Sequence, residues 1–481
     1  MKQIIQSFSN GKTEIVDIPT PKIKENNLLI QSSVSLLSKG TEKMLVDFGK
    51  ANYIEKARQQ PEKVKEVFEK ALTDGIPNTF EAVKTKLEEP FPLGYCNVGR
   101  VIGIGTQVKN YEIGDRVVSN GPHAEIFTTT ENLCAKIPDS VSDEEASFTV
   151  ISSISLHGIR LANPTFGETF LVSGLGLIGL ITTQILKANG CNVLGTDPDP
   201  NKCAIANSLG VETITLSEDS DPIEWCLNLT KNKGVDGTLI TASTPSSDPI
   251  NLASEVTRKN GRIIQIGSTG LNLKREFFYK KELNFKVSCS YGPGRYDSNY
   301  EKKGIDYPIE YVRWTENRNF LAILNALEKR TLNFEPLITH KFQFHNALDA
   351  YTLLSSKENA LAILFIYSKD IPPKRKVNFP IKKDISFSSF EKPIISFIGA
   401  GNFSGRQLIP AFKKTGATLF AIGSLDGLKP YSLAKKFKFK EVTTDIDYLF
   451  DNKKVNTLVI ATRHDSHYKY VIKAILKGKN V

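Results

Sequence analysis

The segment between residues 168 and 197 contains the residues whose spacing points most directly to a chemical role. An apolar stretch, ETFLVS, runs into Gly174-x-Gly176-x-x-Gly179, which opens a helix-like stretch, and a second apolar stretch ends at Asp197. This order of strand, glycine turn, helix and acidic residue is typical of dinucleotide binding. Gly174 permits the tight turn, Gly176 lets the backbone approach a pyrophosphate, and Gly179 lets helix and strand pack closely.

The same segment indicates which dinucleotide binds. The N–H groups that open the helix, at Leu177 and Ile178, favour a pyrophosphate because they carry partial positive charge. Asp197 is placed to bind both ribose hydroxyls, and its charge would repel a 2′-phosphate. We therefore expect NAD at this first site, with Gly267 of the IIQIG stretch also beside the cofactor.

A second, interrupted glycine turn lies in PIISFIGAGNFSGRQLIP, at residues 393–410. Ser404 takes the place of the third glycine, and the next apolar stretch ends in Gly423-Ser424 rather than in an acid. A neutral serine accepts a 2′-phosphate more readily than Asp197 would, so NAD and NADP both remain open for this second site. The expected cofactor contacts in this turn are Gly399, Gly401, Asn402 and Phe403.

The elements around these turns suggest several domains. Residues 1–43 and 91–150 read as short strands, and residues 44–90 read as a helical insertion between them. From residue 167 strands and helices alternate, which predicts a parallel sheet covered by helices. The expected units are a β-rich domain at 1–150 with a return segment at 291–370, a Rossmann domain at 151–290, a linker at 371–393 and a second Rossmann domain at 394–481.

Composition excludes several classes of protein. With 40% hydrophobic and 24% charged residues in 481, the chain is typical of a soluble, multidomain globular protein without a membrane span. The net charge of +10 is spread along the chain, so we expect no nucleic-acid partner. The six cysteines form no C-x-x-C pair, which favours reduced thiols and a cytoplasmic location.

On these motifs, residues 1–370 resemble the medium-chain alcohol dehydrogenases. The matching features are Gly94 in PLGY, GDRVV at 114–118, the first glycine turn, GTD at 195–197 and IIQIG at 263–267. The resemblance implies an α/β fold: a GroES-like β-rich domain with a doubly wound Rossmann domain, followed here by a second, incomplete Rossmann domain.

The resemblance weakens at the places where this family holds catalytic zinc. Leu37-Ser38, Tyr95 and Thr149 stand there, and none is a good zinc ligand, so we expect no metal. Ser38, Lys39, Glu42, Tyr95 and Cys96 fall in the family's active cleft and could act as acids, bases or substrate contacts. Lys39, Tyr95 and Glu42 are the catalytic candidates, while His157 is more simply a structural histidine. The segment with Arg295, Tyr296, Arg313 and Trp314 would suit a hydroxylated or anionic substrate or an ordinary surface loop.

Residues 394–481 resemble the N-terminal domain of the Gfo/Idh/MocA family of oxidoreductases. The shared features are the turn at 398–406, the AKKFKF stretch and VIATRHDSHYKYVIKAILKGKNV. By this resemblance the loop from Thr462 to His467 lies beside the nicotinamide. A following strand and an E-K-P motif belong to that family, and we expect them after Val481 in a longer natural chain.

Together these features predict an NAD(P)-dependent oxidoreductase, independent of zinc, that moves hydride between nicotinamide and an alcohol or carbonyl. A sugar or nucleotide-sugar is the expected small-molecule substrate, by association with similar two-domain oxidoreductases. The rival hypothesis is a dinucleotide-binding sensor or scaffold without turnover. The sequence leaves the oligomeric state open, and a homo-oligomer is one alternative.

Overall fold

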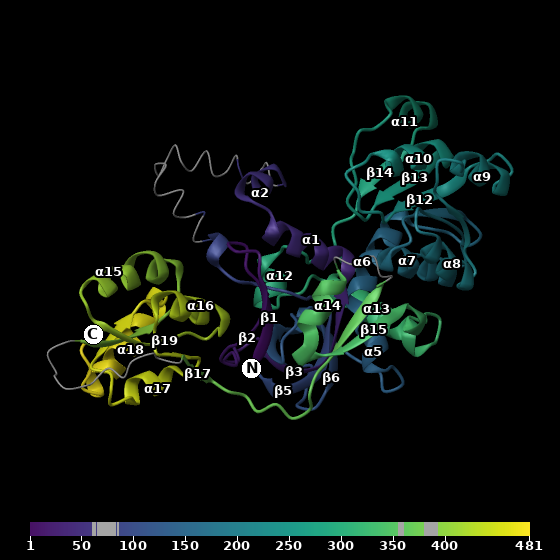
Figure 1. Ribbon diagram of the computed structural model, residues 1–481. Helices are drawn as coiled ribbons and strands as arrows, with labels where there is room; N and C mark the ends of the chain where they lie inside the picture. The colour runs from purple at the N-terminus through teal and green to yellow at the C-terminus, as the bar shows by residue number, and fades with distance from the viewer. Residues whose placement is uncertain (60–63, 65–82, 84–85, 355–359, 380–392) are drawn as a thin grey trace.

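The structure of the chain is a computed structural model that describes residues 1–59, 86–354, 360–379 and 393–481, with Val64 and Val83. A β-rich domain lies between two Rossmann domains, the first drawn in teal and the second in yellow (Figure 1). Most of the helical insertion expected at 44–90 lies outside the described residues. Its described part forms α1 (Lys39–Lys50) and α2 (Tyr53–Gln59).

The β-rich domain is built on a long, buried strand that pairs with neighbours from both ends of the sequence. β3 (Asn27–Ser38) is rich in leucine, isoleucine and valine and is buried along most of its length. β16 pairs antiparallel with β3, and this pairing returns residues 338–366 to the N-terminal domain. The sheet order is β15 (Ile338–Gln343), β16 (Ala362–Ile366), β3, β5 (Asn97–Ile104), β6 (Arg116–Ser119) and β8 (Cys134–Lys136), with β7 (Ile126–Thr130) also on β3.

A smaller antiparallel sheet and several helices complete this domain. Its strands are β2 (Thr13–Asp17), β1 (Lys2–Gln6) and β4 (Phe91–Pro92). Besides α1 and α2, the described helices outside the Rossmann domains include α5 (Asp143–Ala146), α6 (Thr149–Ala162), α12 (Ser298–Lys303), α13 (Glu316–Glu328) and α14 (Ala347–Leu353). Helix α6 connects the β-rich domain to the first Rossmann domain and is buried over most of its length, so it fixes the two together.

The first Rossmann domain is a parallel sheet with the strand order of a dinucleotide-binding fold. The order is β11 (Glu212–Thr215), β10 (Asn192–Asp197), β9 (Thr169–Ser173), β12 (Val235–Ile240), β13 (Thr257–Gln265) and β14 (Asn284–Val287). Its helices are α7 (Leu177–Ala188), α8 (Pro200–Ser208), α9 (Pro222–Leu229), α10 (Asp248–Val256) and α11 (Arg275–Lys281). The order reverses at β9, and ligands bind at such a reversal, beyond the carboxyl ends of the strands.

The second Rossmann domain has the same reversal of strand order in a five-stranded sheet. Its order is β17 (Lys376–Asn378), β20 (Glu441–Thr443), β19 (Thr418–Gly423), β18 (Ile394–Ile398) and β21 (Thr457–Ile460). Its helices are α15 (Ile409–Lys414), α16 (Leu428–Phe437), α17 (Ile446–Asp451) and α18 (His464–Leu476). Within the segment 371–393, predicted as a linker, β17 pairs antiparallel with β20 and covers that edge of the sheet, while residues 380–392 lie outside the described residues.

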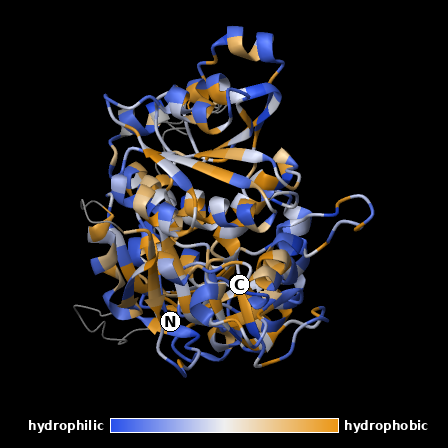
Figure 2. Cartoon of the chain, turned by 90° about the vertical axis from the view of Figure 1, so that its right-hand side faces the viewer, coloured by the Kyte–Doolittle hydropathy of each residue, from blue (hydrophilic) through white to orange (hydrophobic). Residues whose placement is uncertain are grey.

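Hydrophobic residues are concentrated in the strands, while many loop residues are hydrophilic (Figure 2). In β9 four successive residues are buried, as expected for a parallel strand covered by helices on both faces. Among the described helices, none has the length and apolarity needed to cross a bilayer.

Candidate functional site

The first glycine turn has the geometry that a pyrophosphate requires. Gly174 has a φ of +99°, a conformation that glycine adopts readily, and an added Cβ would lie 2.6 Å from the Ala242 nitrogen. At Gly176 an added Cβ would meet no atom within 4 Å, so the space beside this residue is open. At Gly179 an added Cβ would lie 1.9 Å from the Gly174 carbonyl oxygen, which is the close packing of helix on strand.

Asp197 lies directly beneath this turn at the end of β10. Its carboxylate accepts hydrogen bonds from the Leu175 nitrogen at 2.7 Å and from the Asp199 nitrogen at 2.9 Å. Lys202 lies 3.4 Å from the same carboxylate. The structure therefore brings the acid and the glycine turn together, and these residues fit a dinucleotide.

The remaining first-site candidates surround the same opening. Leu177 and Ile178 form the first turn of α7, and the Ile178 carbonyl accepts a hydrogen bond from Ser155 of α6 at 3.2 Å. Gly267 follows β13, and an added Cβ there would lie 2.0 Å from the Ala242 carbonyl oxygen. The backbone at Gly267 therefore packs directly against the backbone at Ala242.

Tyr95 and Thr41 lie side by side in the β-rich domain. The Tyr95 hydroxyl lies 3.2 Å from the Thr41 hydroxyl, and burial raises the pKa of Tyr95 well above its usual value. Burial likewise raises the pKa of the adjacent Cys96 thiol. Both groups therefore stay protonated at neutral pH, so Tyr95 can donate a hydrogen bond but is a poor base.

Glu42 occupies a different environment from the other catalytic candidates. It is fully buried, and its carboxylate oxygens lie 2.8 Å from His123 Nε2 and 2.6 Å from the Tyr351 hydroxyl. The Ser35 hydroxyl lies 2.7 Å from His123 Nδ1. Sequence reasoning missed this cluster because its members come from three distant segments, around residues 35–42, 123 and 351, and the lone histidine in GPHAE carried no signal. Lys39 begins α1, three residues before Glu42.

The polar segment after β14 divides into separate groups. Arg160 and Arg313 stack on the Trp314 ring, 3.3 and 3.8 Å from its centroid. Arg295 instead pairs with Glu301 at 2.6 Å, beside the exposed ring of Tyr296. His157 contacts Gly292, and burial lowers its pKa, so its imidazole is neutral at pH 7.

Glu316, at the start of α13, was not singled out from the sequence. Its side chain is fully buried, and neither carboxylate oxygen has a hydrogen-bond partner among the described residues. Burial, opposed in part by Arg295, raises the pKa of Glu316 to about 8. A single glutamate in a helix N-terminal turn carries no sequence signal for burial.

The residues at the family's zinc positions do not fit a zinc ion. Hydroxyl groups of Tyr95, Ser38 and Thr149 stand there, in place of thiolate, imidazole or carboxylate. Across the part of the chain that the structure describes, no three His, Cys, Asp or Glu side chains are grouped as metal ligands. The Thr149 hydroxyl is buried and has no hydrogen-bond partner within those same residues.

The second glycine turn also has the shape of a dinucleotide turn. Gly399 has a φ of +109° and lies against the Ala461 carbonyl, and an added Cβ at Gly401 would meet no atom within 4 Å. Ser404 is buried at the third glycine position, where α-helical winding is locally loosened to a π-helix, Ser404–Leu408. Phe403 is exposed, and Asn402 accepts a hydrogen bond from Lys429 at 2.6 Å.

The loop after β21 lies at the other side of this turn. His467 Nε2 lies 3.0 Å from the Thr462 carbonyl oxygen, and Ser466 donates to the Thr462 hydroxyl at 2.7 Å. Since Gly399 contacts Ala461, the structure brings Thr462 and His467 to the reversal point of the second sheet.

Known protein families match both the first and the second Rossmann region of the chain. Residues 178–303 match the family described as "Zinc-binding dehydrogenase", and residues 395–481 match "Oxidoreductase family, NAD-binding Rossmann fold". D-xylulose reductase of Scheffersomyces stipitis is 24% identical over 58% of this chain and 83% of its own length. D-guloside 3-dehydrogenase of Escherichia coli is 29% identical over 54% of this chain and 73% of its own length.

A solved structure supports the fold of the first two domains. The 2R,3R-butanediol dehydrogenase of Bacillus subtilis aligns with a TM-score of 0.58 and 17% identity, covering 76% of this chain and 99% of that one. The chain thus combines a region similar to the zinc-binding, medium-chain type of dehydrogenase with a domain similar to the NAD-binding Rossmann domain of the Gfo/Idh/MocA family, and both halves indicate an NAD(P)-dependent oxidoreductase.

Proposed function

We propose that the first site uses NAD to interconvert a polyol or sugar alcohol with its carbonyl form. The buried carboxylate of Asp197 beneath the open turn at Gly176 is the observation that carries the cofactor assignment. The similarity to a xylulose reductase and a guloside dehydrogenase supports a substrate with neighbouring hydroxyl groups. All six cysteines are free thiols, and five of them are buried. Because free thiols are typical of a reducing compartment, a cytoplasmic location is part of the same proposal.

The second part of the proposal is that this chemistry needs no zinc. The hydroxyl groups of Tyr95, Ser38 and Thr149 can donate or accept hydrogen bonds, but they are poor zinc ligands at neutral pH. A protonated Tyr95 can stabilise negative charge on the substrate oxygen, as a donor in place of a Lewis acid. Lys39 would donate the second hydrogen bond to the substrate oxygen.

We assign the roles of the candidate residues from their burial and their hydrogen-bond partners. NAD, when bound, supplies the hydride acceptor. Tyr95 and Lys39 would hold the substrate oxygen, and the unpartnered hydroxyl of buried Thr149 offers a further contact. Glu42, held by His123 and Tyr351, would position α1 and therefore Lys39, and it would not contact substrate itself.

The experiment is NADH formation by the purified full chain, tested with a panel of polyols and reduced sugars. Tyr95→Phe removes the donor but keeps the ring, so kcat should fall by at least about 100-fold, in the range seen when one such donor is lost. Tyr311→Phe is the matched control because the Tyr311 side chain is exposed. A Tyr95→Phe variant with parental kcat would remove Tyr95 from the mechanism.

A sensor or scaffold without turnover remains the second candidate. The burial of Glu42 against His123 and Tyr351, which withdraws one of the three catalytic candidates from contact with a substrate, favours it. Saturable NADH binding by the full chain, with no turnover of any polyol or carbonyl compound in either direction, would support this candidate over the dehydrogenase.

A further inference from the structure

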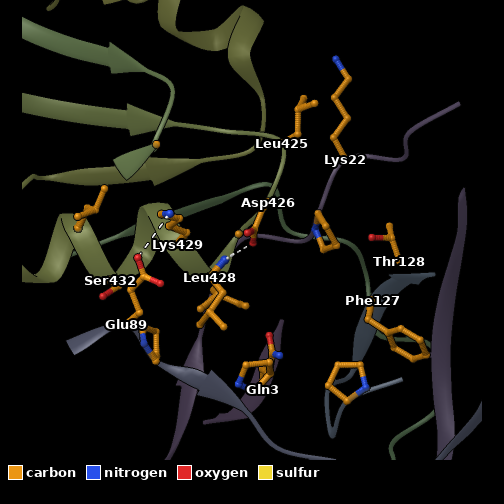
Figure 3. Close-up of a pocket in the computed structure, with 18 of the residues that line it drawn as sticks. Gln3, Lys22, Glu89, Phe127, Thr128, Leu425, Asp426, Leu428, Lys429 and Ser432 are labelled. Carbon is orange, nitrogen blue, oxygen red and sulfur yellow. Dashed lines mark hydrogen bonds and ion pairs between the residues drawn. The ribbon is translucent and has the colours of Figure 1, made fainter. Parts of the chain in front are cut away.

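We propose that the β-rich domain completes the nucleotide pocket of the second Rossmann domain, so that the adenosine half of a dinucleotide bound there lies between the two domains. A cavity of about 470 Å³ lies between them and is lined by residues of both (Figure 3). Its second-domain wall includes Gly401 and Asn402 of the glycine turn, together with Asp426 from the loop after β19. In this fold that loop faces the adenosine ribose, and the volume is in the range of small-molecule sites.

The opposite wall comes from the β-rich domain. Gln3, Phe127 and Thr128 line the cavity from β1 and β7, facing Leu428 at the start of α16 (Figure 3). Apolar surface with a few polar groups is what a purine ring and a ribose require. Without this domain, the nucleotide pocket would be open to solvent on that side.

Hydrogen bonds and close backbone contacts hold the two walls of the cavity together. The Lys22 nitrogen donates to the Leu425 carbonyl at 2.9 Å, and the Thr444 hydroxyl donates to the Thr20 carbonyl at 2.5 Å. An added Cβ at Gly427 would lie 2.1 Å from the Pro19 carbonyl oxygen, so the chains touch. The cavity is therefore a fixed feature of the docked domains.

Lys429 connects both walls to the glycine turn. Its Nζ lies 2.6 Å from Asn402 Oδ1 and 3.6 Å from Glu89 Oε1 of the β-rich domain. A phosphate arriving at the turn would compete with Glu89 for this cation. Dinucleotide binding at the second domain should thus depend on residues that lie outside it.

The test uses the full chain with Gly176→Val, which silences the first site, and titrates NADH and NADPH by fluorescence. Thr128→Trp fills the cavity from the β-rich side and should raise the Kd of the better-bound cofactor at least 10-fold. Thr106→Trp, in an exposed turn away from the cavity, is the matched control and should stay within twofold.

Hydrogen exchange gives a second measurement that does not require the Thr128 variant to fold. In the Gly176→Val chain, NADH or NADPH should protect residues 19–24, and adding Gly401→Val should abolish that protection. Binding that needs Gly401 but ignores Thr128→Trp and leaves residues 19–24 unprotected would overturn the proposal. Absence of saturable binding in the Gly176→Val chain would also overturn it. Turnover of the Gly401→Val chain tests the first site separately.

Discussion

Replacing Gly176 with valine separates cofactor binding from folding at the first site. Gly176 has a φ of −66° and a ψ of −173°, which any residue can adopt, and an added Cβ meets no protein atom within 4 Å. The free energy of unfolding should therefore change by less than about 1 kcal/mol. The valine methyl groups would instead occupy the space of the pyrophosphate.

The cost to binding has two parts. Overpacking against a rigid ligand costs about 1–3 kcal/mol, and losing charge-assisted hydrogen bonds from the turn costs about 1.5–3 kcal/mol. Their sum is at least about 2.5 kcal/mol, so the Kd for NAD should rise roughly 60-fold or more.

The assay is calorimetric titration with NADH in a Gly401→Val background, which removes the second turn, together with thermal unfolding. Gly179→Ala is the contrasting control. Its Cβ would lie 1.9 Å from the Gly174 carbonyl oxygen, so this variant should lose stability as well as binding. Unchanged NADH affinity in the Gly176→Val, Gly401→Val chain would refute the placement of the pyrophosphate at this turn.

Three further predictions follow from the described contacts. Asp197→Ser should weaken NAD binding by roughly 1.5–3 kcal/mol and narrow the preference over NADP, as competitive titration of both cofactors will reveal. If this variant and the parent discriminate equally, Asp197 does not contact the ribose. Treatment with a strong chelator should leave turnover unchanged, and elemental analysis should find substoichiometric zinc; activity lost on removing one zinc per chain and regained with zinc would contradict the hydroxyl-based cleft. Because the folded-state pKa of Glu316 is raised from 4.5 to about 8, its stabilising protonated form is lost as pH rises, and the free energy of unfolding should fall between pH 4.5 and 8. Glu316→Gln should flatten that slope in denaturant titrations, and an unchanged slope would place the pH dependence elsewhere.

The sequence determined the local features of this protein. The turn from Gly174 to Gly179 joins a strand directly to a helix, so its conformation follows from a few neighbouring residues, and the same holds for Gly399 and Gly401. Alternating apolar stretches likewise predicted the parallel sheets, because strand and helix periods are properties of short segments.

Only the tertiary structure decided which distant groups meet. Glu42, His123 and Tyr351 come from segments up to 309 residues apart, and their burial turned a catalytic candidate into a proposed positioning group. The composition of residues 371–393 predicts a linker, and only the folded chain shows that Lys376–Asn378 pairs with β20 at the edge of the second sheet. The cavity beside Gly401 lies where the surfaces of two domains meet, and no pattern within either surface encodes the other.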